Sequence, residues 1–85
     1  MFTKIVLDIL KPHEPSIIEL SRSLCELKSI DRVNIVVQEV DSETETVKVT
    51  VEGHGMKFHS VRERIEQNGG VVHGIDEVEL TRVKR

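Results

Sequence analysis

Two short stretches of the chain bring together the side-chain types that bind divalent cations. The first holds His13 and Glu14 between two prolines, and the second is an acidic segment over residues 39–45. Carboxylate oxygens are the ligands that Ca²⁺ and Mg²⁺ prefer, and one imidazole can complete such a set. The candidate ligands of this cation site are His13, Glu14, Glu39, Asp41, Glu43 and Glu45.

The same stretches also fit a simpler interpretation, a solvated charged turn beside the start of a helix. Charge runs are most often solvated, and Glu14 would lie near a helix N-terminus, where a negative charge is favourable. Residues 39–45 lack the twelve-residue spacing and the central glycine of an EF-hand. Calorimetric titration with Ca²⁺ or Mg²⁺ distinguishes the two interpretations.

The other reactive side chains do not form a recognisable catalytic pattern. His54, His59 and His73 show no metal-binding spacing of the His-x₃-His kind, and a hydrogen-bonding role is expected for His73. Cys25 is the only cysteine, which excludes a disulfide within the chain and a zinc site built from several thiolates. Its place beside helical leucines predicts a small packed residue rather than a nucleophile.

Composition argues against nucleic acid as a partner. The chain has 12 basic and 15 acidic residues, no Trp or Tyr, and two Phe. Phosphate binding requires a basic surface, and base stacking requires aromatic side chains. The only basic cluster is the tail with Arg82, Lys84 and Arg85.

The first residues carry no targeting signal. Met1 to Lys4 run directly into a strand pattern without an apolar h-region or a cleavage site, and no apolar run approaches the length of a membrane span. Together with the single cysteine, this predicts a cytoplasmic protein without a membrane partner.

Alternating and β-branched segments predict four strands that could position the candidate residues. The first covers residues 3–11, with Ile5, Leu7 and Ile9 on one face. The others are expected over residues 33–40, 46–52 and 71–80. Gly74, inside the last of these, is expected to mark a bulge.

Two helices are predicted between these strands. The first begins at Ser16, which with Glu19 matches the capping box, and has Lys28 in its last turn. Its apolar stripe consists of Ile17, Leu20, Leu24 and Leu27. The second covers residues 57–68, and Asn68-Gly69-Gly70 is a strong stop signal.

The order β-α-β-β-α-β predicts an α+β fold, the ferredoxin-like βαββαβ sandwich. In this fold one four-stranded antiparallel sheet, in the order 4-1-3-2, carries both helices on one face. Eighty-five residues are expected to form a single domain, residues 1–85. Residues 11–15, 41–45 and 69–70 should gather at one end of the sheet, and residues 28–32, 53–55 and the tail at the other.

The sheet face away from the helices is predicted to be partly apolar. Asp8 lies there in mid-strand, where it would pair with Lys48 on an open face or need a partner under a second subunit. The side chains expected in such an interface are Val6, Asp8, Leu10, Val36 and Val40. A part-apolar face of this kind indicates contact between copies of the chain.

The chain also resembles a known family in five segments. They are Val-Leu-Asp-Ile-Leu-Lys-Pro-His-Glu-Pro-Ser (6–16), Val-Asn-Ile (33–35), Glu-Val-Asp-Ser-Glu-Thr-Glu (39–45), Val-Glu-Gly (51–53) and Gly-Gly-Val-Val-His-Gly-Ile-Asp-Glu-Val (69–78). The family is the archaeal "domain of unknown function 211", and the resemblance covers nearly the whole chain. It implies a ferredoxin-like fold, a cytoplasmic archaeal protein and ring-like homo-oligomers, and it implies no activity. Residues 54–57, where a more acidic segment is expected, and Gly74, where Ser is expected, depart from the family pattern.

Three functions remain open. The first is a non-enzymatic, self-assembling domain that binds a divalent cation or a small ligand at residues 11–15 and 39–45. The second is a purely structural or partner-binding module, and the third, which we favour least, is an enzyme. Three other functions of this fold lack their motifs: the first loop has no Cys-x-x-Cys for copper and no arginine for acyl phosphate, and the strands lack the aromatic residues that bind RNA. An amino-acid-sensing regulatory domain, which binds its ligand near the first loop and often at a subunit interface, stays open.

Overall fold

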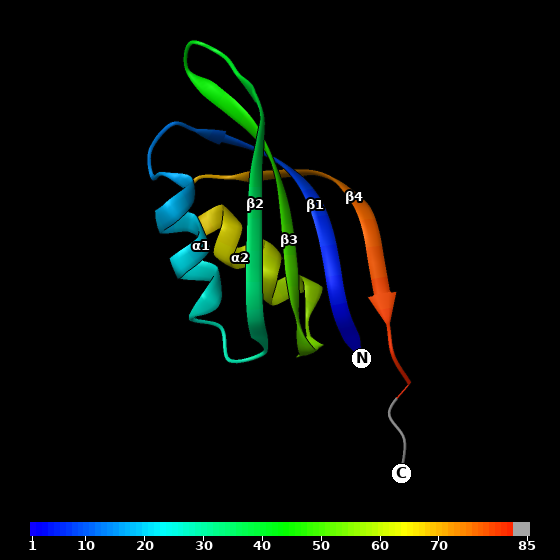
Figure 1. Ribbon diagram of the computed structural model, residues 1–85. Helices are drawn as coiled ribbons and strands as arrows, with labels where there is room; N and C mark the ends of the chain where they lie inside the picture. Colours follow the sequence, from blue (N-terminus) through cyan, green and yellow to red (C-terminus); the bar gives the residue numbers. More distant parts are fainter. Residues whose placement is uncertain (83–85) are drawn as a thin grey trace.

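The computed structural model describes residues 1–82, in which six elements form the predicted βαββαβ sandwich (Figure 1). Lys84 and Arg85 of the basic tail lie outside this range. The elements are β1 (Phe2–Pro12), α1 (Ile17–Cys25), β2 (Ile30–Val40), β3 (Thr44–Met56), α2 (Phe58–Gln67) and β4 (Val71–Leu80).

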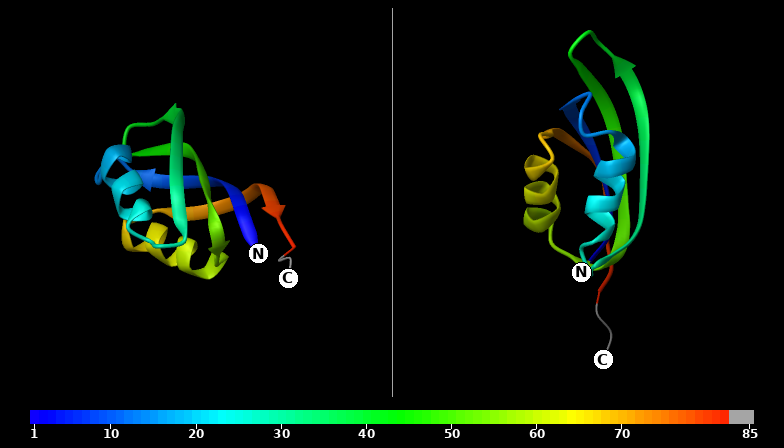
Figure 2. Two further views of the ribbon diagram at one scale, coloured as in Figure 1. Left: turned by 60° about the horizontal axis from the view of Figure 1, so that its bottom comes forward. Right: turned by 90° about the vertical axis from the view of Figure 1, so that its left-hand side faces the viewer.

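The four strands form one antiparallel sheet in the order β2-β3-β1-β4, which confirms the predicted topology. Both helices lie on the same face, as the edge-on view in Figure 2 shows. We call this the helix-covered face and the other the open face. β2 and β4 are the two edge strands.

The core lies between the helices and the helix-covered face. Ile5, Leu7 and Ile9 of β1 alternate onto this face and are fully buried, as predicted. The other buried apolar residues of this core are Leu20, Leu24, Ile30, Val47, Val49, Val51, Met56, Val61 and Ile65. The inward side chains of the two central strands, β1 and β3, therefore meet the apolar stripes of both helices in one layer.

The start of α1 follows from its cap. Ser16 has an extended backbone, and its hydroxyl accepts the amide hydrogen of Glu19 at 3.3 Å, which is the N-cap half of the predicted capping box. The preceding Glu14–Pro15 peptide bond is cis. The end of α1 was predicted too late: the helix stops at Cys25 with Glu26 as its C-cap, so Lys28 lies in the following turn.

Register shifts interrupt the pairing of both edge strands, in addition to shifts near the start of β1, between Phe2 and Lys4, and near the start of β2, between Ile30 and Arg32. β2 shifts register between Val37 and Glu39, and β4 shifts on either side of Gly74, where the bulge was predicted. Each shift moves later side chains of the edge strand to the opposite face of the sheet, because alternation has a period of two. The long β2–β3 hairpin ends in a turn that extends past the rest of the sheet (Figure 1).

No helix among residues 1–82 has both the length and the apolar character that crossing a membrane requires.

Candidate functional site

The end of β1 carries a lysine in the core layer. Lys11 continues the alternation of Ile5, Leu7 and Ile9 onto the helix-covered face, and it is only 1% exposed. Its ammonium group donates hydrogen bonds to a Glu45 carboxylate oxygen at 2.8 Å and to the Pro12 carbonyl at 2.7 Å. The charge is therefore buried together with its counterion, as buried charges require.

Glu45 is positioned by the sheet register. It lies at the start of β3, directly opposite Lys11 on β1, and its side chain is 13% exposed. The hydrogen bond from Lys11 is the largest cause that lowers the pKa of Glu45, and His13 lowers it further, while burial opposes both. Glu45 is therefore a carboxylate that contacts both the Lys11 ammonium and the His13 ring.

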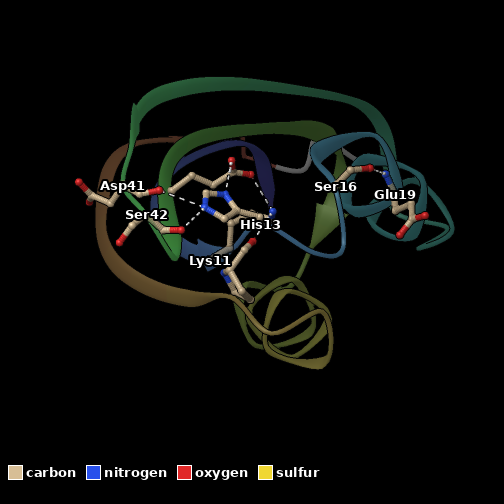
Figure 3. Close-up of polar contacts among 8 residues, drawn as sticks. Lys11, His13, Ser16, Glu19, Asp41 and Ser42 are labelled. Carbon is tan, nitrogen blue, oxygen red and sulfur yellow. Dashed lines mark hydrogen bonds and ion pairs between the residues drawn. The ribbon is translucent and has the colours of Figure 1, made fainter.

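His13 joins the first loop to the β2–β3 turn (Figure 3). Its Nε2 lies 3.0 Å from the Asp41 carbonyl and 3.2 Å from the Ser42 carbonyl, and its Nδ1 lies 3.4 Å from a Glu45 carboxylate oxygen. The pKa of His13 is raised, chiefly by the bond to Glu45 and also by the two carbonyls, while burial acts in the opposite direction. The predicted meeting of residues 11–15 with residues 41–45 is thus confirmed.

The remaining candidate ligands do not converge on this point. Glu14 and Glu43 are exposed, and the Asp41 side chain points away from the imidazole ring (Figure 3). Glu39 lies opposite Thr46, on the open face, because the register shift after Val37 moves it there. The expectation that Glu39 points toward the His13 edge is corrected by this register.

This geometry has a consequence for the predicted cation site. Among residues 1–82, no group of three or more His, Cys, Asp or Glu side chains is placed to hold a metal ion. A cation bound to Glu45 would have to compete with Lys11 and His13 for its oxygens. Binding of Ca²⁺ or Mg²⁺ at this edge stays a prediction for titration.

The other histidines and the cysteine lie apart from this network. His54 contacts Asp31 at 3.0 Å at the opposite end of the sheet, and His59 contacts Glu63 at 3.4 Å on the outer surface of α2. His73 is exposed. Cys25 is also exposed, so its expected packing is wrong: it lies at the last position of α1, past the buried stripe.

The open face carries a row of charges across three strands. Asp8 lies opposite Lys48 on β3 and opposite Gly74 on β4. Lys48 binds Asp76 at 2.8 Å, which raises the pKa of Lys48 and lowers the pKa of Asp76. Burial is the largest cause that raises the pKa of Asp8, followed by its hydrogen bond with Asp76.

The predicted interface residues do not lie together on one exposed surface. Val6 is buried within the single chain, with only 7% of its surface exposed, and Asp8 and Leu10 are half-buried. Val36 is exposed on the open face, opposite Lys48. Val40 was expected on the same face, but the register shift in β2 places it opposite Glu45, on the helix-covered face.

Exposed apolar side chains instead concentrate on the two edge strands. Seven of the nine large ones among residues 1–82 lie there, Val36, Val37 and Val40 on β2 and Val71, Ile75, Val78 and Leu80 on β4. Four of them lie opposite residues of the helix-covered face: Val37 opposite Val47, Val40 opposite Glu45, Ile75 opposite Leu7, and Val78 opposite Ile5.

Sequence reasoning found His13 and Glu45 but missed Lys11. The signal for Lys11 was present, because the alternation that buries Ile5, Leu7 and Ile9 also points Lys11 inward. The apolar edge of β4 was missed as well. The signal there was an edge strand without any lysine or proline, the residues that commonly protect sheet edges.

Two comparisons with known proteins place the chain. The model of the family DUF211, described as uncharacterized ArCR, matches residues 3–82. A protein of Methanocaldococcus jannaschii, "Uncharacterized protein MJ0319", is 56% identical over 75 residues, which cover 88% of this chain and 77% of the relative. Neither description gives an activity. The chain belongs to the DUF211 family.

Proposed function

We propose that the protein is a self-assembling module in which copies of the chain join through the edge strands β2 and β4. The observation that carries this proposal is the concentration of exposed apolar side chains on these two strands. An edge strand also presents unpaired backbone N–H and C=O groups. Joining two edges buries both the apolar side chains and the unpaired backbone groups.

The two edges match each other in the face that carries their apolar residues. Val37 and Val40 on β2, and Ile75 and Val78 on β4, all lie in the register of the helix-covered face. If β2 of one copy lies beside β4 of the next, these side chains continue one apolar layer across the junction. A second copy of the chain is therefore the occupant that these edges fit.

Charge does not oppose this contact. Two of the three acidic side chains of β4 are paired inside the chain, since Asp76 binds Lys48 at 2.8 Å and Glu77 binds Lys4 at 3.1 Å, and Glu79 accepts a hydrogen bond from the Thr3 hydroxyl at 2.8 Å. Because β2 and β4 lie at opposite edges of the sheet, each copy would use two different surfaces. Such head-to-tail contacts close into rings when the rotation between copies allows it.

Sedimentation velocity with two matched variants tests the proposal. The wild-type chain is expected to sediment as an oligomer at micromolar concentration, and Val78→Lys is expected to shift it toward the monomer. Ile18→Lys is the control, because Ile18 is 63% exposed on α1 and lies on neither edge strand. A wild-type chain that stays monomeric, or an oligomer that Val78→Lys leaves intact, contradicts the proposal.

A further inference from the structure

The two ring nitrogens of His13 face only hydrogen-bond acceptors. Nε2 lies 3.0 Å and 3.2 Å from the carbonyl oxygens of Asp41 and Ser42, and Nδ1 lies 3.4 Å from a carboxylate oxygen of Glu45. A neutral imidazole has one N–H and one lone pair, and only the imidazolium donates from both nitrogens. The imidazolium alone satisfies both sides of this arrangement.

The groups around the ring support the cationic form. Glu45, the titratable group that faces His13 from β3, is held as an anion by Lys11 of β1, whose ammonium binds the other oxygen of the same carboxylate. From the turn, Asp41 presents its carbonyl oxygen, while its carboxylate points away (Figure 3). The positive charge of Lys11 disfavours a second cation nearby. Lys11 and His13 contact different oxygens of the Glu45 carboxylate, however, so its negative charge interacts with both side chains.

We propose that His13 is a proton-dependent latch, which as a cation holds the β2–β3 turn against the first loop and weakens this contact when it loses its proton. Hydrogen bonds from a charged donor are about twice as strong as neutral ones. Each neutral tautomer also leaves a lone pair facing an oxygen, on the Glu45 side or on the turn side. Loss of the proton from either ring nitrogen therefore weakens the contact between the first loop and the turn.

The turn that the latch would hold has little other support. Within the turn, the Asp41 amide donates a hydrogen bond to the Thr44 carbonyl at 2.8 Å, and residues 41–43 are exposed. The turn also lies past the rest of the sheet (Figure 1). The contacts of His13 with the turn lie within a single chain. They do not depend on whether copies of the chain assemble.

The direction of the pH dependence follows from the raised pKa of His13. A cation whose pKa is higher in the folded state stabilises that state fully below its ordinary pKa of 6.5. This contribution is lost as the pH rises through the raised value. While Glu45 is ionised, the latch is therefore closed below pH 6.5 and opens as the pH rises through the raised pKa of His13.

NMR spectroscopy of the wild-type chain provides the first test. We expect the imidazole nitrogens of His13 to titrate above pH 6.5, with both nitrogens protonated below the transition. A neutral tautomer of His13 at pH 6, or titration at or below the ordinary value, overturns the proposal.

Hydrogen exchange provides the second test. As the pH rises through the titration of His13, the protection factor of the Asp41 amide should fall about five- to tenfold, the loss expected for a charge-assisted bond in a partly exposed site. The Ile30 amide, bonded to the Leu27 carbonyl at the other end of the sheet, should not change. In His13→Gln the Asp41 profile should be flat, and in His59→Gln it should match the wild type. Equal pH profiles in wild type and His13→Gln overturn the proposal.

Discussion

At the scale of single residues, the end of β1 depends on one buried ion pair. Lys11 occupies a position in the inward alternation of Ile5, Leu7 and Ile9, and its ammonium group donates hydrogen bonds to Glu45 and to the Pro12 carbonyl. A buried pair of this kind adds little net stability compared with apolar side chains of the same size. Removing one partner is costly, however, because the other charge stays buried without compensation.

Lys11→Met should therefore lower the free energy of unfolding by about 3 kcal/mol, because Glu45 keeps its charge in a site with little access to water. The double variant Lys11→Met/Glu45→Leu should recover part of this loss, since it removes both charges. Denaturant-induced unfolding measures each value, and Lys28→Met, at an exposed position, is the control. If the single variant is no less stable than this control, the buried pair does not have the assigned role.

The candidate site could be predicted only as far as local patterns reach. His13 and the acidic turn were correctly brought together, because strand order and strand direction fix which loops meet. Glu39 and Val40 were placed on the wrong faces, because a one-residue register shift in β2 exchanges the faces and no residue type in that segment signals it. Lys11 was missed although the alternation of β1 also points it inward.

At the scale of elements, local signals predicted where helices begin better than where they end. Ser16 starts α1 through its side chain, a bond that depends on residue type. The end of α1 at Cys25 depends on how the following turn returns to β2, where the Ile30 amide bonds to the Leu27 carbonyl at 3.0 Å. The end of α2 was predictable because Gly69, which follows it, has a positive φ that favours glycine.

Gly69→Ala should destabilise the protein by about 1 kcal/mol, because Gly69 has a φ of +82° after α2. A Cβ at this position would make only ordinary contact with the Pro12 ring, at 3.5 Å, so the cost is assigned to the backbone. Gly74→Ala is the matched control, since a Cβ at Gly74 meets nothing within 4 Å. Thermal unfolding of both variants measures the difference, and equal melting temperatures would contradict the assignment.

At the scale of the whole molecule, the proposed assembly can be tested by asking which sheet edges lie side by side. Two arrangements bury the apolar edges: β2 of one copy against β4 of the next, or each edge against the same edge of a second copy. The first repeats in one direction and gives rings or filaments, whereas the second pairs copies about two-fold axes. The helix-covered register shared by Val37 and Val78 is compatible with both arrangements, and the proposed assembly corresponds to the first.

Cross-linking can separate these arrangements in a Cys25→Ser background, which removes the exposed native thiol. With a flexible bismaleimide, the chain carrying both Val37→Cys and Val78→Cys should give a ladder of species larger than the dimer, because every copy would link to a neighbour on each side. Val78→Cys alone should give no cross-linked dimer, since β4 would lie beside β2 and not beside another β4. Dimers from Val78→Cys alone would instead show same-edge pairing, and the absence of any cross-link in the double variant would leave neither edge in contact. The pattern of bands thus reports which strand lies next to which, independently of how many copies the assembly contains.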